Sequence, residues 1–260
     1  ALGEGVHLQD GDHSRMRWRS WRALRASARV DQTVATDCAI MPYTRMRGIL
    51  REFGIPVPVG LARGRAVVRE ALESADNGLP DLLRPMIAET LQEITALTER
   101  IARIEATLTA LSRTDPVVQR LLKLPGVGLL GATAVRAAVG DIQRFPTGRH
   151  FASWLGLTAR EHSSAETRRL GRISKQGDTY LRTLLVHGAR SALCAAARAH
   201  SQGRPLDRLR LWALATEQRR GRNKATVALA NKLARIIWAT WRYQRPFAGD
   251  WPARLETTPS

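Results

Sequence analysis

An apolar stripe in the middle of the chain constrains the fold more than any other feature. Isoleucine and leucine recur there at steps of three and four residues, at Ile87, Leu91, Ile94, Leu97, Ile101, Ile104, Leu108 and Leu111. Side chains with that spacing share one face of an α-helix, so the segment predicts a helix of about 25 residues and roughly 37 Å. The stripe either pairs with a second chain as a coiled coil or packs within a bundle, and we expect a homodimer or higher oligomer.

Other segments also carry helical periods and helix-ending signals. The sequence MRGILREFGI predicts a short amphipathic helix that stops at Gly54, Pro56 and Pro58. Further helices are expected over residues 64–78, 117–124, 145–157, 179–200, 206–219 and 224–243. No strand-like alternation appears between them, and a hydrophobic content of 44% is enough for a core. The predicted fold class from Tyr43 onward is therefore all-α, a long coiled-coil-like helix followed by a helical domain.

Changes in composition divide the chain into four segments. Residues 1–44 lack a hydrophobic period and place many Arg side chains around Trp18 and Trp21. They form either a basic helix that contacts nucleic acid or a poorly ordered leader, and we favour the leader. Residues 45–115 hold the helical segment with the long helix, and residues 116–245 hold the C-terminal helical domain. Residues 246–260, with three prolines, are expected to form a loose tail.

The charge of the chain points to a polyanionic partner. The formal net charge is +18, and the segment from Arg160 to Arg245 carries 19 Lys or Arg against 5 Asp or Glu. Such an excess favours binding to phosphates through counterion release. We therefore expect nucleic acid as the partner and a binding face in the C-terminal part of the chain.

The sequence gives no sign of a membrane segment or a disulfide framework. Cys38 and Cys194 lie far apart without metal-binding spacing, which fits a reducing cytoplasm. No apolar run approaches the roughly 20 residues that span a bilayer, and the first 30 residues contain no signal-peptide core. We expect no membrane partner.

A glycine pair follows the short helix at 117–124. Gly126 and Gly128 flank Val127 between two helical segments, which is the spacing of a helix-hairpin-helix turn. Glycine permits the tight turn, and free N–H groups at the start of the second helix can bind a phosphate. The alternative is an ordinary connection between helices, but the neighbouring basic region favours the helix-hairpin-helix.

A serine pair lies inside the basic region. Ser163 and Ser164 follow His162, and four cationic side chains come next, Arg168, Arg169, Arg172 and Lys175. A serine becomes a nucleophile when a base or a metal assists it, and nearby cations can offset the charge that develops at a phosphorus atom. The alternative is a loop that only grips phosphates. From residue types alone, the alternative is favoured.

Several ordered motifs identify a family. The stretch from Leu124 to His187 contains LPGVG, GDIQRF, FASWLGLTAR, HSS, RLGRISKQGD and YLRTLLVHGAR. It resembles the C-terminal transposase domain of the DEDD transposases, the bacterial insertion-sequence recombinases of the "one-ten" family. The resemblance is strongest to the "eleven-eleven" branch, which is related to the Piv DNA invertases, and it covers about residues 45–245.

The resemblance implies an activity and its partners. Members of this family carry out DNA transposition and recombination, with an N-terminal RNase H-like domain that binds Mg²⁺ through four carboxylates and a C-terminal serine that attacks the DNA phosphate. It also implies a guide RNA and dimers that pair into tetramers.

Position by position, the resemblance assigns site residues in this chain. The family pattern HSSGG falls on residues 162–166, which makes Ser164 the catalytic nucleophile and Ser163 the runner-up. Ala165 and Glu166 stand where the family has two glycines. The predicted DNA-binding residues are Gly126, Gly128, Arg168, Arg169, Arg172, Lys175 and Arg182.

The sequence contains no recognisable metal-binding set. The aspartates at positions 10, 12, 31 and 37 are scattered through unpatterned sequence. We therefore expect no metal site in this chain, an absent RNase H-like domain and a frame-shifted or degraded leader, so that this chain alone is inactive. The competing interpretations are a catalytically inactive DNA-binding and dimerising remnant, or a helical dimerisation module.

Overall fold

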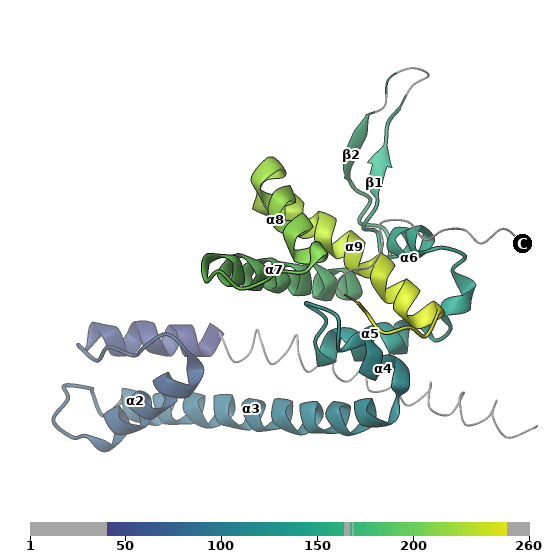
Figure 1. Cartoon of the computed structure of the whole chain (residues 1–260). Helices are drawn as coiled ribbons and strands as arrows, with labels where there is room; N and C mark the ends of the chain where they lie inside the picture. Colours follow the sequence, from purple (N-terminus) through teal and green to yellow (C-terminus); the bar gives the residue numbers. More distant parts are fainter. Residues whose placement is uncertain (1–40, 164–166, 168, 249–260) are drawn as a thin grey trace, which may run out of the picture. The chain divides into compact units, whose positions relative to one another are not determined.

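The computed structural model describes residues 41–163, 167 and 169–248, which fall into two compact units. One unit takes the described residues up to Thr107 and the other takes those from Leu108 onward. Ser164, Ala165, Glu166 and Arg168 lie outside the described residues, as do the leader up to residue 40 and the tail from residue 249. The described part is helical apart from one two-stranded sheet, which confirms the predicted all-α class (Figure 1).

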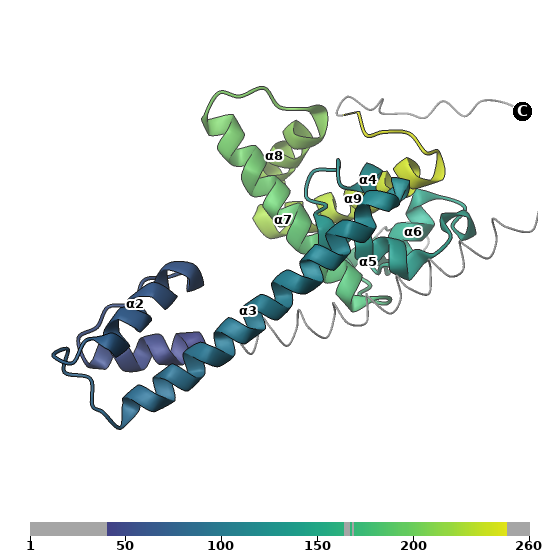
Figure 2. The ribbon, with the colours of Figure 1, turned by 90° about the horizontal axis from the view of Figure 1, so that it is seen from below.

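The first unit is a small helical cluster. A helix over residues 41–52, helix α2 (Leu61–Glu73) and the first part of α3 (Leu83–Thr114) lie side by side (Figure 2). Their shared core includes Leu50, Val68 and Ile94, each at most 1% exposed. The hydroxyl of Tyr43 donates to the carbonyl of Pro58 at 2.8 Å and so holds the loop after the first helix. The amphipathic pattern of MRGILREFGI is thus a core-facing helix, as predicted.

Helix α3 confirms the long helix predicted from the apolar stripe. It has 32 residues, whereas the stripe predicted about 25. Ile87, Leu91 and Ile94 are buried in the core of the first unit, and Leu108 is buried in the second. The middle of the stripe is only half-buried, at Leu97, Ile101 and Ile104. Dimerisation through this helix stays a prediction.

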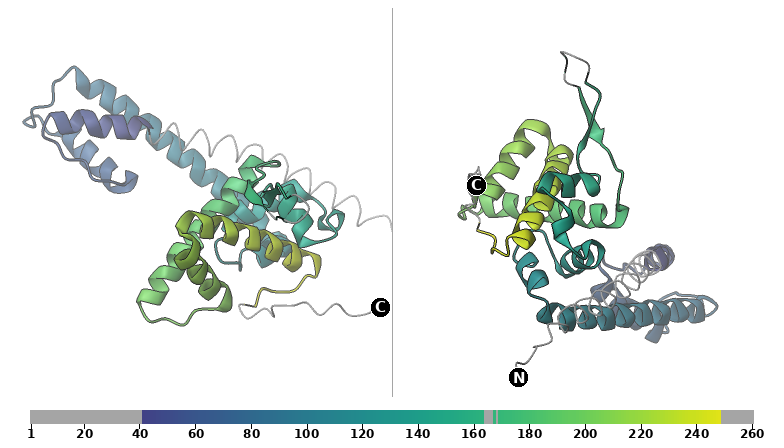
Figure 3. Two further views of the ribbon diagram at one scale, coloured as in Figure 1. Left: turned by 90° about the horizontal axis from the view of Figure 1, so that it is seen from above. Right: turned by 90° about the vertical axis from the view of Figure 1, so that its right-hand side faces the viewer.

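The second unit is a bundle around its last helix. It contains the end of α3, then α4 (Pro116–Leu121), α5 (Leu129–Val139), the 3-10 helix η1 (Ile142–Arg144), α6 (Gly148–Trp154), α7 (Thr179–Ser201), α8 (Arg208–Arg220) and α9 (Arg222–Arg242). Helix α9 packs against α4, η1, α6, α7 and α8 (Figure 3). Leu233, Ala234 and Ile237 of α9 are fully buried, so α9, the last helix in the described part of the chain, forms the centre of the core.

Polar side chains fix the ends of these helices. Asp115, Thr147, Asp178 and Asp207 each accept a hydrogen bond from a backbone N–H in the first turn of the helix that follows. Asp115 is 2% exposed, and its second oxygen accepts from Arg136 Nε at 2.9 Å. Arg136 also donates to the carbonyl of Gly140 at 2.8 Å and lies over the Trp241 ring at 5.2 Å. The ion pair between the buried Asp115 and the half-buried Arg136 therefore joins α4 and α5, and the ring contact of Arg136 adds α9.

The turn between α4 and α5 contacts α7 through backbone atoms. Gly126 has φ of 79°, and a Cβ built there would lie 2.3 Å from the carbonyl oxygen of Gly188. A Cβ on Gly188 would lie 1.9 Å from the carbonyl oxygen of Gly126. Both positions therefore require glycine because two backbones touch there. The predicted pair of helices around the turn is present, while its DNA-binding role stays a prediction.

The close contact predicts opposite effects for two glycines on helices. Gly188→Ala should lower the free energy of unfolding by about 2 kcal/mol, because the added methyl pushes α7 away from the turn. Gly131→Ala, the matched control within α5, should raise it by up to about 1 kcal/mol, since its Cβ would only touch Val127 at 3.8 Å. Urea denaturation of both variants measures the difference. Equal stability of the two variants would contradict this packing.

Candidate nucleic-acid interface

A short hairpin carries the predicted serine site. Strand β1 (Ala159–Glu161) pairs antiparallel with β2 (Leu170–Ile173), with Ala159 opposite Ile173 and Glu161 opposite Leu170. The backbone N–H of His162 donates to the carbonyl of Arg169 at 2.8 Å and extends the ladder by one more bond. The basic segment around the serine pair was expected to be a loop, but its two ends form the antiparallel strands β1 and β2.

Ser163 is held by two hydrogen bonds within the hairpin. Its hydroxyl donates to Glu161 Oε1 at 2.8 Å and accepts from the backbone N–H of Arg169 at 3.2 Å. The side chain is exposed. A serine that donates to a carboxylate has a proton acceptor in place, which is one requirement for nucleophilic attack. For the runner-up residue, the geometry thus supplies a candidate base that sequence reasoning had not identified.

Arg182 and the loop after β2 serve the packing of the bundle. Arg182 donates to the carbonyl of Leu155 at 3.3 Å and to the hydroxyl of Thr179 at 3.1 Å, which ties the start of α7 to the end of α6. The backbone N–H of Lys175 donates to the carbonyl of Gly156 at 3.1 Å. Gly177, with φ of 111°, lies so close to Trp154 that a Cβ would clash with its carbonyl oxygen. These contacts fix the base of the hairpin on the bundle.

The other predicted DNA-binding residues differ in accessibility. Arg169, Arg172 and Lys175 have exposed side chains. Gly128 is exposed as well, at the N-cap of α5, and Gly126 is half-buried against α7. The structure therefore brings Arg172 and Lys175 together with a larger set of cations, described next, and places Gly126 in a packing contact.

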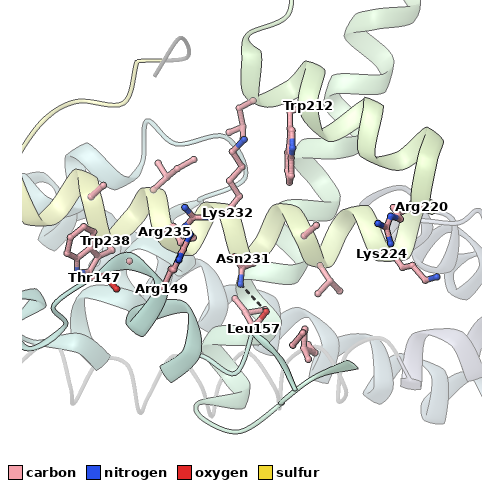
Figure 4. A pocket seen from close by; sticks show the side chains of 18 of the residues that line it. Thr147, Arg149, Leu157, Trp212, Arg220, Lys224, Asn231, Lys232, Arg235 and Trp238 are labelled. Atoms are coloured by element: carbon pink, nitrogen blue, oxygen red, sulfur yellow. Dashed lines mark hydrogen bonds between the residues drawn. The ribbon is translucent and has the colours of Figure 1, made fainter. Parts of the chain in front are cut away.

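A wide groove crosses the second unit between α6, the base of the hairpin, α8 and α9 (Figure 4). Its volume is about 1660 Å³, above the range of about 300–1,000 Å³ for small-molecule pockets. Eight cationic side chains line it: Arg149, Arg172, Lys175, Arg208, Arg220, Lys224, Lys232 and Arg235. Among the described residues that line the groove, none is Asp or Glu. We call this surface the basic groove.

Six of these eight cations were absent from the sequence prediction. Three of the six lie on α9, where Lys224, Lys232 and Arg235 are separated by eight and three residues. Such steps put side chains on one face of a helix, so this spacing is a signal that the sequence does contain. The other three, on α6 and α8, join the groove only through the packing of those helices against α9.

Lys232 is the most constrained cation of the groove. Its ammonium group lies 4.0 Å from the centre of the Trp212 ring, and both residues are half-buried. Burial lowers the pKa of Lys232 below its ordinary value, and the charges of Arg235 and Arg208 lower it further. Next to it, the amide of Asn231 donates to the carbonyl of Leu157 at 3.0 Å and anchors α9 to the chain after α6. The helices therefore hold several positive charges close together in the groove, and a bound anion would reduce the repulsion between them.

The described residues contain no group of three or more His, Cys, Asp or Glu side chains that could hold a metal ion. Within the same residues, no helix is long and apolar enough to cross a membrane.

Comparison with known proteins shows what this chain is similar to. A family model described as "Transposase IS116/IS110/IS902 family" matches residues 118–204. A "Probable family 20 transposase" of Pseudomonas aeruginosa is 44% identical over 199 residues, which cover 75% of this chain and 56% of that protein. The transposase for insertion sequence element IS1111A of Coxiella burnetii is 36% identical over 217 residues, or 84% of this chain and 57% of that protein.

A third similar protein is also named as an insertion-sequence transposase. The transposase for insertion sequence element IS1328 of Yersinia enterocolitica is 33% identical over 217 residues, which cover 62% of that protein. The chain therefore spans a little over half the length of these curated relatives. The matches confirm the resemblance to insertion-sequence transposases, while the DEDD and Piv-like assignments stay predictions.

The crowding of charge predicts that Lys232→Met stabilises the fold. Because the pKa of Lys232 is lowered, the unfolded chain binds this proton more tightly than the folded chain, so stability rises with pH between the lowered pKa and 10.5. Below that pH range, replacing the lysine removes the cost of burying its charge and the repulsion from Arg235 and Arg208. Because solvent screens part of both, the midpoint of thermal unfolding should rise by only roughly 2 °C. The advantage should shrink as the pH rises toward 10.5.

Lys123→Met is the matched control, because Lys123 is exposed and lies outside the groove. It should leave the midpoint unchanged. A lower midpoint for Lys232→Met at pH 7 would show that the contact with Trp212 outweighs the crowding.

Proposed function

We propose that this chain, whose residues 118–204 belong to the IS116/IS110/IS902 transposase family, binds DNA and takes part in strand cleavage at the ends of an insertion sequence. The observation that carries the proposal is the basic groove, which the hairpin with the serine pair borders directly. Ala159 lines the groove, and Ser163 is four residues farther along the chain, at most about 14 Å away. DNA held in the groove is thus within reach of the hairpin.

The proposed chemistry is attack by a serine on a DNA phosphate. The resemblance assigns the attack to Ser164. Its hydroxyl gives up its proton, its oxygen bonds to phosphorus, one P–O ester bond of the strand breaks, and the leaving oxygen takes up one proton, so that the number of protons is unchanged. Arg169 and Arg172 would offset the negative charge that builds up at phosphorus. Ser163 is the second candidate nucleophile because the Glu161 carboxylate accepts a hydrogen bond from its hydroxyl and could take its proton.

The cofactor and further partners are part of the proposal. The resemblance implies Mg²⁺, but the described residues offer no set of ligands that fits it. The resemblance also implies a guide RNA and a second copy of the chain. The half-buried middle of the α3 stripe, at Leu97, Ile101 and Ile104, is the segment we propose for pairing.

A second candidate function is DNA binding without chemistry. It is favoured by Ala165 and Glu166, which replace the family's glycine pair beside Ser164. A glutamate there adds negative charge next to the site of the phosphate, and alanine enters positive φ less readily than glycine.

Trapping a covalent adduct decides between these functions. Incubation of the chain with Mg²⁺ and labelled element-end DNA should give a band that survives denaturing electrophoresis. The band should persist in Ser163→Ala and disappear in Ser164→Ala, with circular dichroism confirming that both variants fold. Loss of the band in Ser163→Ala alone would assign the attack to Ser163 and Glu161. DNA that binds but never forms an adduct would favour the inactive DNA-binding protein.

A further inference from the structure

We propose that the basic groove binds a single strand of DNA, with its phosphates on the cationic rim and its bases on an apolar floor. The inference rests on the proposed function only in taking DNA as the partner. It adds which form of DNA the groove accepts and which residues recognise it.

The rim of the groove consists of its exposed cationic side chains. Seven of the eight cations have exposed side chains, and Lys232 is half-buried. Lys224 and Arg220 lie at the junction of α8 and α9, and Arg149 lies on α6 next to Arg235 (Figure 4). The cations therefore extend along the groove, as a chain of phosphates requires, instead of converging on one point.

The floor is made of carbon atoms. Ile173, Val227, Ala228 and Ile236 line the groove and are half-buried, between the exposed cations. Duplex DNA presents its charged backbone outward and keeps its bases stacked inside, so it has nothing apolar to set against such a floor. A single strand exposes base faces that can cover it, and apolar contact with a base compensates for the removal of water.

Tyr243 supplies a stacking surface at the end of α9. Its side chain is 48% exposed and lines the groove. The ring meets Trp238 edge to face, with centroids 5.6 Å apart and an interplanar angle of 86°. Because nearly half of the Tyr243 side chain is exposed, part of its ring surface is available to a base. Trp212, by contrast, already has the Lys232 ammonium over its ring.

The floor also favours DNA over RNA. A ribose adds a 2′-hydroxyl that needs hydrogen-bond partners once it leaves water. The side chains of Ile173, Val227 and Ile236 offer none, and the Asn231 amide beside them already donates to the carbonyl of Leu157. The other non-aromatic, uncharged polar side chains that line the groove, Thr147 and Asn223, are exposed, and no carboxylate is present among the described lining residues. Deoxyribose carries no 2′-hydroxyl, so its contact with the apolar side chains leaves no such group without a hydrogen-bond partner.

Fluorescence anisotropy with a labelled oligo-dT of about ten nucleotides tests the floor. Tyr243→Ala should weaken binding of oligo-dT about tenfold, since one stacked base is lost, and should leave binding of a duplex of equal length unchanged. Tyr243→Phe keeps the ring and should restore the affinity. An unchanged affinity for oligo-dT in Tyr243→Ala, or an equal loss for the duplex, would overturn the inference.

The salt dependence of the same binding tests the rim. The double variant Lys224→Gln, Arg235→Gln removes two phosphate contacts and should reduce the slope of log K against log salt by about 1.4 for oligo-dT. The matched control, Arg190→Gln with Arg198→Gln, changes two exposed arginines of α7 outside the groove and should leave the slope unchanged. Equal slopes in the two double variants would contradict a phosphate path along the rim.

Competition experiments separate this inference from the proposed function. Tighter binding of oligo-U than of oligo-dT, or competition by polyglutamate as strong as by oligo-dT, would identify RNA or an acidic protein as the occupant and overturn the inference. A chain that binds duplex DNA but not oligo-dT refutes the inference and leaves the proposed function standing. A chain that binds neither refutes both.

Discussion

The packing of α9 at the centre of the second unit is the constraint on which its surface depends. One face of α9 is buried against α4, α6, α7 and α8, with Leu233 and Ile237 fully inaccessible. Each such side chain contributes about 1.5–3 kcal/mol on burial. The other side of the same helix carries Lys224, Lys232 and Arg235 into the basic groove, where like charges repel. Apolar packing of one face therefore holds together the cations of the other.

Specific contacts attach the remaining helices to this centre. The Asp115 carboxylate caps α4 and pairs with Arg136, which lies over the Trp241 ring of α9. The indole N–H of Trp238 donates to the carbonyl of Phe145 at 2.9 Å and fixes the chain before α6. Because these groups are buried, each needs its partner, and removing one would leave an unsatisfied polar atom. These contacts therefore fix the positions of the helices that line the groove.

The bundle that lines the groove also holds the base of the hairpin. Contacts of the chain after β2 with residues 154–156 hold the base of the hairpin on the bundle, and that base forms part of the groove wall. DNA bound in the groove would pass beside the strands that lead to the serine pair. The proposed division of labour follows: the groove binds the strand, and the hairpin presents the hydroxyl.

The helices, the all-α class and the resemblance to insertion-sequence transposases could all be predicted from the amino-acid sequence. Helical periods such as the stripe from Ile87 to Leu111 are local, so they can be read without the fold, and the ordered motifs after Leu124 were confirmed by the family match over residues 118–204. The sequence did not indicate the hairpin, because strands of three and four residues are too short for a recognisable alternation.

The residues that form the basic groove could be identified only from the folded chain. Its cations come from α6, the region of β2, α8 and α9, so their neighbourhood depends on how four separate elements pack. The same holds for Gly126, whose glycine is required by Gly188 some sixty residues later, and for Arg182, whose guanidinium is bound to the end of α6. Periodicity and charge are properties of the chain, whereas contacts between distant residues exist only once the core has formed.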